Sequence, residues 1–240
     1  MTQKPLIGIT LDWKENGSFA DRPFYAMEQD YFTAVDVAGG IPMAIPCKHT
    51  HGIDLYVEKI DGLLAPGGNF ASPENWYVSD NGKSPYAPSP RAAFEIDLIS
   101  KTLKAGKPVL GICAGMQIMA GIFDCKMTEN IHKHLKTDID HLHGKALPEF
   151  AYDVDITPDT LLHKIMGKTC CPINSHHQEA VVSAPEHIRI NAIATDGCIQ
   201  GIEIPQYDFA IGVQWHPEVF LGDDKNSFLP LFQAFIKAAS

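Results

Sequence analysis

Cys113 has the surroundings of a catalytic nucleophile. An apolar run, Val-Leu-Gly-Ile over residues 109–112, leads into a Gly-x-Cys-x-Gly turn, and a helical segment follows. Such a strand–turn–helix is the cysteine form of a nucleophile elbow, in which small residues permit the sharp turn. The helix N-terminus beside the sulfur favours the thiolate, which is the reactive form. Taken alone, this cysteine could also be a buried structural thiol.

Two stretches of backbone offer amides for the oxyanion that forms when a thiolate attacks a carbonyl. One is the amide of Ala114, directly after the nucleophile. The other is Pro66-Gly67-Gly68, which ends an expected strand, so that the amides of Gly67 and Gly68 could supply a second donor. On its own, a Pro-Gly-Gly segment predicts only a turn. We interpret its amides as oxyanion donors only because a nucleophile is expected at Cys113.

A base for the thiol is expected at His216, in Gly-Val-Gln-Trp-His-Pro-Glu over residues 212–218. A strand delivers His216 to its carboxyl end, and Pro217 favours an extended conformation there. Positions two apart then face the same way, so Glu218 could hold the imidazole nitrogen that does not face the thiol. Ends of parallel strands are where open α/β sheets bind ligands. We therefore predict a catalytic triad of Cys113, His216 and Glu218.

Metal binding is not expected. The pairs His132/His134 and His141/His143 have no standard zinc spacing and no accompanying carboxylate pattern. Their stretch, residues 130–149, is interpreted as a polar surface loop. We predict a reaction that needs neither a metal nor another cofactor.

Strand-like and helix-like segments alternate through the first half of the chain, and strands dominate the second half. This order predicts an α/β fold with a parallel sheet extended by antiparallel strands. No linker is apparent, so residues 1–240 are assigned to one domain. The expected strands cover 6–10, 42–46, 62–65, 108–112, 152–156, 188–194, 199–204 and 210–213, and the expected helices 28–38, 51–58, 91–105 and 228–236.

Composition narrows the classes of partner. The formal charge of −10 and the absence of a Lys/Arg run argue against nucleic-acid binding. No apolar run approaches the ~20 residues needed to span a bilayer, so no membrane partner is expected. The six cysteines contain no CxxC pair and are interpreted as reduced thiols of a cytoplasmic protein.

Together, the segments Gly-Ile-Cys-Ala-Gly-Met-Gln and Gly-Val-Gln-Trp-His-Pro-Glu and the upstream Pro-Gly-Gly make the chain resemble class I glutamine amidotransferases. Within them it is most similar to the peptidase C26 group of γ-glutamyl hydrolases, which includes γ-glutamyl-γ-aminobutyrate hydrolase. The resemblance covers nearly the whole chain. It implies a flavodoxin-like, three-layer amidotransferase fold with a mostly parallel central sheet, the Cys-His-Glu triad and a γ-glutamyl thioester intermediate.

The resemblance also suggests substrate-binding residues. Gln117 matches the family glutamine that contacts the bound substrate. The segment Asn-Ser-His-His-Gln over 174–178, which includes Asn174, Ser175 and His177, corresponds to a loop near the substrate's amino-acid end. A solvated polar turn is an equally good interpretation of that segment. The chain departs from the group's usual residues at Phe70, Ala114, Ala120, Asp124-Cys125 and Glu179.

Three functions compete. The leading one is cleavage of γ-glutamyl amides of small molecules. The second is a glutaminase that passes ammonia to a synthetase, which would have to be a separate partner because these 240 residues leave no room for it. The third is a non-catalytic binding protein, against which the complete triad argues. The oligomeric state is not determined by the sequence, and a homodimer stays open.

The leaving-group side of the site is expected in residues 69–90. This long segment contains Phe70, Trp76, Tyr77 and Tyr86, which would suit an apolar or amine-bearing chain. Relatives often carry Asp at the position of Phe70. We therefore expect Phe70 to weaken any preference for a cationic leaving group.

Overall fold

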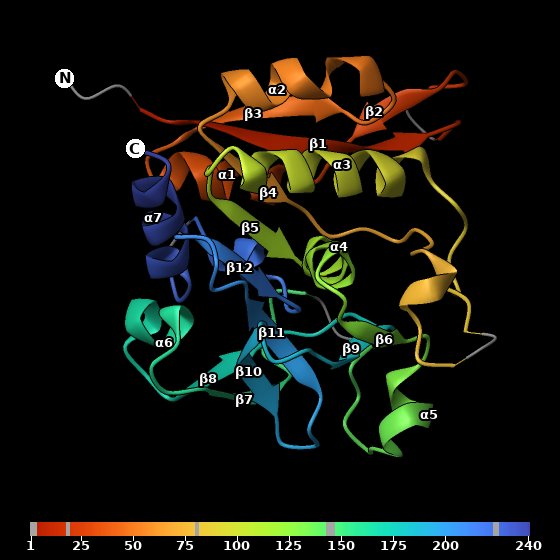
Figure 1. The fold of residues 1–240 in the computed structure, drawn as a ribbon, viewed down its shortest axis with the longest axis vertical. Helices are drawn as coiled ribbons and strands as arrows, with labels where there is room; N and C mark the ends of the chain where they lie inside the picture. The colour runs from red at the N-terminus through yellow and green to blue at the C-terminus, as the bar shows by residue number, and fades with distance from the viewer. Residues whose placement is uncertain (1–3, 18–19, 80–81, 143–146, 223–225) are drawn as a thin grey trace.

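The computed structural model describes residues 4–17, 20–79, 82–142, 147–222 and 226–240. Its centre is a mixed β-sheet in which neighbouring strands follow the order β2-β1-β4-β5-β12-β11-β10-β7-β8, while β3 pairs with β1 (Figure 1). The strands are β1 (Leu6–Lys14), β2 (Phe24–Ala26), β3 (Ile41–Pro46), β4 (Gly62–Ala65), β5 (Val109–Ile112), β7 (Tyr152–Ile156), β8 (Cys170–Ile173), β10 (Arg189–Ala194), β11 (Ile199–Glu203) and β12 (Ala210–Val213).

The sheet has a parallel half and an antiparallel half. Strands β3, β1, β4, β5 and β12 run parallel to their neighbours. From β12 onwards, β11, β10, β7 and β8 pair antiparallel, as β2 does with β1. The central strands β4, β5 and β12 are buried along their whole length, as expected for strands covered on both faces. The predicted parallel sheet with antiparallel additions is confirmed.

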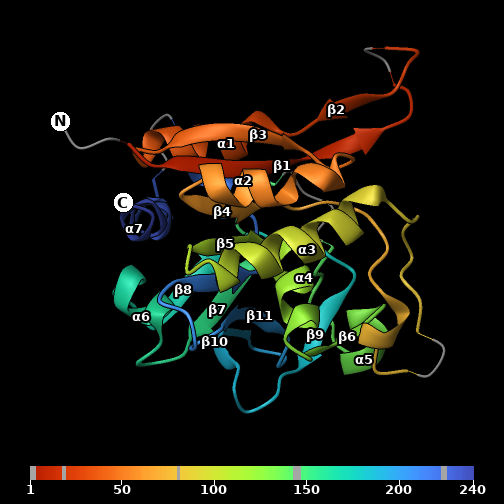
Figure 2. The ribbon, with the colours of Figure 1, turned by 45° about the horizontal axis from the view of Figure 1, so that its top comes forward.

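Helices cover both faces of the sheet, which gives three layers. One face is covered by α1 (Gln29–Val37), α6 (Leu161–Met166) and α7 (Leu229–Ala238), whose apolar side chains join one core cluster. The other face carries α2 (Ile53–Lys59), α3 (Pro90–Lys104) and α4 (Ala114–Ile122), which form a second cluster (Figure 2). The longest of them, α3, is capped by Ser89, whose hydroxyl accepts from the Arg91 amide.

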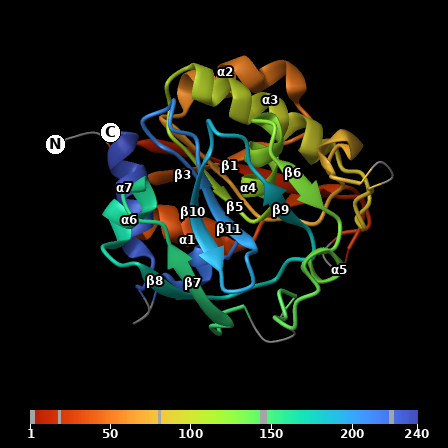
Figure 3. The same cartoon turned by 60° about the horizontal axis from the view of Figure 1, so that its bottom comes forward.

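Short segments complete the fold. A small sheet of β6 (Lys126–Thr128) and β9 (Ala180–Ser183) lies beside α5 (Ile131–Leu135), as Figure 3 shows. The 3₁₀ turns are η1 (Thr50–Gly52), η2 (Glu74–Trp76) and η3 (Pro217–Phe220). The sequence did not predict β2, β6, β8, β9, α5 or α6. Each of these six spans only three to six residues, too few for a periodic pattern.

None of the helices in the described ranges combines the length and the apolar character that a membrane span requires.

Candidate active site

Cys113 lies at the carboxyl end of β5 and directly precedes α4. Its backbone has φ 51° and ψ −107°, a conformation that favours glycine and is strained for other residues. Close packing fixes this turn, because a Cβ at Gly115 would stand 2.0 Å from the carbonyl oxygen of Ala65. The thiol is 7% exposed and Gln214 Nε2 donates to it at 3.5 Å. The local structure is thus a nucleophile elbow, as predicted.

His216 reaches the same point from the neighbouring strand. Strand β12 pairs in parallel with β5, with Val213 opposite Ile112, so the segments after both strands meet at one edge of the sheet. The side chain of His216 hydrogen-bonds Cys113. Its Nδ1 lies 2.7 Å from Glu218 Oε1. The structure therefore brings together the three side chains of the predicted triad.

The charge state of His216 follows from these contacts. Burial lowers the pKa of the imidazole, but the negative charges of Glu218 and Cys113, and the hydrogen bonds to both, raise it well above its usual value. Tyr31 adds a further contact, with its hydroxyl 3.4 Å from His216 Nδ1. The arrangement favours an imidazolium beside the sulfur.

The Pro66-Gly67-Gly68 turn follows β4 and borders the thiol. The Gly67 amide donates to the Tyr31 hydroxyl at 2.9 Å. Arg91 Nη1 donates to the Gly67 carbonyl at 2.8 Å and Nη2 to the Pro66 carbonyl at 2.6 Å. A peptide bond is planar and trans, so Arg91 on the Gly67 carbonyl places the Gly68 N–H on the opposite side of that peptide. Within the described ranges Gly67 N–H has a partner and Gly68 N–H has none, so of the two predicted glycine amides that of Gly68 is open to a ligand.

A cavity of about 540 Å³ opens above the thiol. Its walls come from β1, the start of α1, the Pro-Gly-Gly turn and the segment after β12. Cys113, His216 and Glu218 line it together with Gly67 and Gly68. The site therefore combines a thiol, an imidazole and a space large enough for a small molecule.

The remaining predicted substrate-binding residues lie behind this cavity. Gln117 donates to the Glu179 carbonyl at 3.0 Å and to Gln214 Oε1 at 3.1 Å. Asn174 holds the backbone of His216 through two hydrogen bonds. Its Oδ1 accepts from the His216 amide at 2.9 Å, and its Nδ2 donates to the His216 carbonyl at 3.0 Å. Among the described residues that line the cavity, neither Gln117 nor Asn174 appears. Asn174 positions His216, which does line the cavity, whereas Gln117 contacts Gln214, which in turn donates to the Cys113 thiol.

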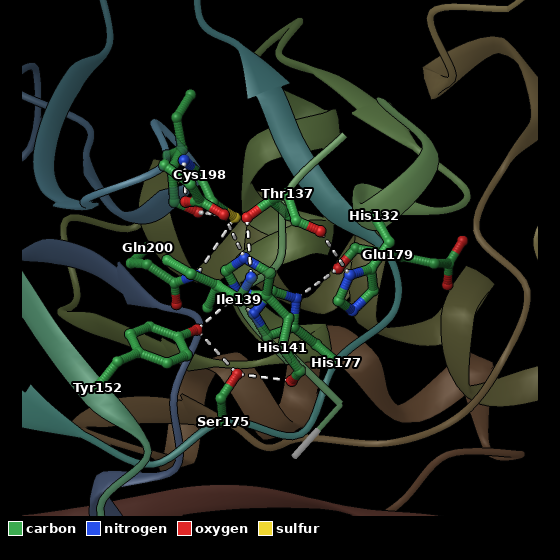
Figure 4. A network of polar contacts seen from close by, with 12 residues as sticks. His132, Thr137, Ile139, His141, Tyr152, Ser175, His177, Glu179, Cys198 and Gln200 are labelled. Carbon is green, nitrogen blue, oxygen red and sulfur yellow. Dashed lines mark hydrogen bonds and ion pairs between the residues drawn. The ribbon is translucent and has the colours of Figure 1, made fainter. Parts of the chain in front are cut away.

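Ser175 and His177 belong to a separate buried network, drawn in Figure 4. Ser175 accepts from the Tyr152 hydroxyl at 2.9 Å and donates to the His141 carbonyl at 2.6 Å. His177 Nδ1 lies 2.9 Å from the Glu179 carbonyl, and burial lowers the pKa of its imidazole to about 3. The neutral ring then donates from Nδ1 and accepts at Nε2, where Gln200 Nε2 lies 3.2 Å away. These side chains face the interior of the protein.

The same network contains the described residues that could hold a metal ion. The ligand atoms of His141, His177 and Cys198 all lie within 4.8 Å of one another and are buried. Hydrogen bonds already engage them, because His141 contacts Asp196 at 2.9 Å and Gln200 donates to Cys198 Sγ at 3.3 Å. The predicted surface loop is wrong at His141, which is 0% exposed. His143 lies outside the described residues.

The expected leaving-group wall is also wrong in part. Trp76 and Tyr77 are buried, and a Cβ at Gly121 would stand 2.2 Å from the Trp76 ring, so this ring packs on α4. Phe70 is 4% exposed, and the Arg91 guanidinium lies 5.1 Å from its ring centre. These aromatic side chains build the core and support Arg91.

Sequence reasoning missed Tyr31, Arg91 and Gln214. The pair Arg91 and Glu95 carried a signal, since opposite charges four residues apart share a helix face. Both side chains are 0% exposed, and Nε of Arg91 lies 3.0 Å from Glu95 Oε1. Tyr31 and Gln214 gave no comparable signal, because their roles depend on partners far away in the chain.

Comparison with known proteins agrees with this architecture. The chain matches the Peptidase C26 family over residues 5–218, and it belongs to that family. It is a glutamine amidotransferase-like hydrolase.

Individual relatives and structures fit this class. A glutamine amidotransferase-like protein of Rickettsia prowazekii is 30% identical, with 100% of this chain and 99% of the relative covered. The gamma-glutamyl-gamma-aminobutyrate hydrolase PuuD of Escherichia coli (strain K12) is 25% identical, with 98% and 93% covered. The glutaminase domain of Trypanosoma brucei CTPS with bound acivicin superimposes with a TM-score of 0.65 at 15% identity, covering 98% and 93%. The last likeness shows the fold alone.

Proposed function

We propose that this protein hydrolyses γ-glutamyl amides of small molecules through Cys113, His216 and Glu218. The observation that carries the proposal is the strained elbow of Cys113, whose thiol hydrogen-bonds a histidine held by a carboxylate. Elbow strain at a non-glycine residue is characteristic of functional sites. The γ-glutamyl specificity is supported by the relatives named for that activity.

In the proposed reaction the Cys113 thiolate attacks the γ-carbonyl carbon and a C–S bond forms. The amides of Ala114 and Gly68 hold the oxyanion. When the intermediate collapses, the C–N bond breaks and the His216 imidazolium gives its proton to the departing amine. Water then attacks the thioester while His216 accepts its proton. The C–S bond breaks, and glutamate and the free thiolate result.

A substrate comparison tests the proposal. We expect γ-glutamyl amides to be hydrolysed, and α-glutamyl and N-acylated γ-glutamyl amides of the same amine to be poor substrates. A site that hydrogen-bonds the amino-acid end rejects analogues that leave its polar groups unpaired. Release of the amine is measured with the purified protein. Equal rates on the α- and γ-linked compounds would refute the γ-glutamyl assignment.

The relative named as glutamine amidotransferase-like supports one second candidate. In that function the chain would release ammonia from glutamine for a synthetase. Glutamine belongs in the same comparison. Turnover of glutamine that appears only when a partner protein is added would favour this second function over the hydrolase.

The pH profile provides a test of the Glu218 role. In Glu218→Gln the amide oxygen still accepts from His216 Nδ1, but the negative charge that raises the pKa of His216 is lost. The imidazolium then deprotonates at lower pH. The alkaline limb of the plot of kcat against pH should therefore shift to lower pH by at least about one unit. Asp153→Asn, an exposed change on β7, is the control and should leave the limb in place. An unmoved limb in Glu218→Gln would contradict the assigned role.

A further inference from the structure

A second hollow borders the active-site cavity. This hollow has a volume of about 570 Å³ and shares Asp12, Lys14 and Asn69 with the first. The shared wall lies at the end of β1 and after the Pro-Gly-Gly turn. A substrate bound at Cys113 therefore has room for a leaving group that extends past this wall.

The first hollow carries carboxylates at the start of α1. Glu28 directly precedes the helix and Asp30 lies in its first turn, and both line the cavity. Glu28 is exposed and Asp30 half-buried. No ion pair between described residues involves either of them. Both are thus available to a cationic ligand.

Lys14, Arg91 and His216, which line this hollow, each already have a carboxylate partner, and that of His216 is Glu218. Lys14 Nζ lies 2.6 Å from Asp12 Oδ2, and Arg91 is paired with the buried Glu95. The charges that line the second hollow are balanced, since Asp12 and Glu15 are accompanied there by Lys14 and Lys48. The second hollow gives room for a long leaving group, whereas the excess of negative charge lies in the first hollow.

In the proposed reaction the leaving group departs beside His216, and α1, which carries Asp30 and follows Glu28, packs close to that residue. His216, which protonates the amine in the proposed reaction, directly precedes η3, and η3 packs against α1. Tyr31 of α1 touches both His216 and Gly67. The proton donor and the two carboxylates therefore border the same end of the cavity.

We propose that the leaving group is an amine with a second, cationic amino group, which Glu28 and Asp30 recognise while the second hollow holds the distal part of the chain. The inference rests on the proposed γ-glutamyl hydrolase function and names its substrate class. It reverses the expectation drawn from Phe70, because Phe70 is buried against Arg91 and the carboxylates come from α1 instead. An anionic leaving group, such as an aminobutyrate, faces like charges there.

Three γ-glutamyl amides with one four-carbon chain test the inference: those of butylamine, of 4-aminobutyrate and of 1,4-diaminobutane. We expect the highest kcat/KM for the diamine and the lowest for the aminobutyrate. The two carboxylates attract the ammonium of the diamine and repel the carboxylate of the aminobutyrate, so we expect them to separate these two compounds by about tenfold. The separation should shrink in 0.5 M NaCl, because the Debye length falls well below ~8 Å.

The double variant Glu28→Gln/Asp30→Asn should bring the ratio of diamine to aminobutyrate close to one. Asp153→Asn/Asp155→Asn is the matched control: it removes two exposed carboxylates from β7 and should keep the wild-type ratio. A wild-type preference for the aminobutyrate, or a ratio that the active-site double variant and salt do not change, would overturn the inference alone. Failure to hydrolyse any of the three amides would overturn the γ-glutamyl hydrolase function and the inference with it.

Discussion

Cys113→Ser should lower kcat/KM by roughly 10³-fold or more while the protein stays folded, since losing a nucleophile leaves only binding and the oxyanion donors. A hydroxyl at this site is far less ionised than the thiol that the helix N-terminus favours. Hydrolysis of the γ-glutamyl amide is measured together with the unfolding midpoint. Cys170→Ser is the matched control because its thiol is exposed, and it should keep full activity. Equal loss in both variants would contradict the assignment of the nucleophile.

The backbone of Cys113 adds a stability readout to this test. Glycine adopts φ 51° without strain, whereas alanine does not. Cys113→Gly should therefore be more stable than Cys113→Ala by about 1–3 kcal/mol, although both are inactive. Equal stability of the two variants would show that the elbow is not strained.

The meeting of Cys113 and His216 at one end of the sheet could be predicted because its signals are local. Strands β5 and β12 are short, continuous apolar runs, and the residues that end them follow at once. Parallel strands present their carboxyl ends at one edge, so Cys113 and His216 had to meet if the two strands were neighbours. The structure makes them neighbours.

Side chains whose surroundings come from distant segments could not be predicted in this way. The stretch around His141 looks polar in sequence, yet the ring is buried between Tyr152 and Asp196, which are supplied by β7 and by the turn before β11. A polar residue becomes a core residue when partners satisfy its hydrogen bonds. The sequence shows the residue but not those partners.

For the aromatic segment after β4, the sequence suggested a role in binding where the structure shows a role in packing. A long loop with Trp76 and Tyr77 suggested a binding wall, but both rings fill space beside α4 and β6. Burial of large aromatic surface is worth more to stability than exposure in a cavity would be. Composition alone does not distinguish the two uses.

Arg91 is the residue that we expect to matter most outside the triad. Its guanidinium holds two successive carbonyls of the Pro-Gly-Gly turn, those of Pro66 and Gly67, while Nε is paired with Glu95. Thr10 hydrogen-bonds the same carboxylate and so fixes it from β1. The three nitrogens of the planar arginine fork reach these three acceptors from fixed positions, whereas lysine ends in one nitrogen and cannot hold the same three acceptors in this geometry.

Arg91→Lys should therefore retain the charge beside Glu95 but release the turn. The Gly68 amide would lose its fixed direction toward the oxyanion. Removal of one oxyanion donor lowers kcat by about 10²–10³-fold, and we expect a loss at the lower end of that range with a smaller change in KM. Steady-state kinetics with one γ-glutamyl amide provide the measurement.

A matched control distinguishes this positioning role from general stabilisation. Lys107 also holds backbone carbonyls, since its Nζ donates to those of Val57 and Ile60 at 2.7 and 2.6 Å, but at the opposite end of the sheet. Lys107→Met should lower the unfolding midpoint and leave kcat within about twofold, because oxyanion contacts act only at the reacting centre. If Arg91→Lys changed only the midpoint, or if Lys107→Met lowered kcat equally, Arg91 would be a structural residue without a role in orienting the Gly68 amide.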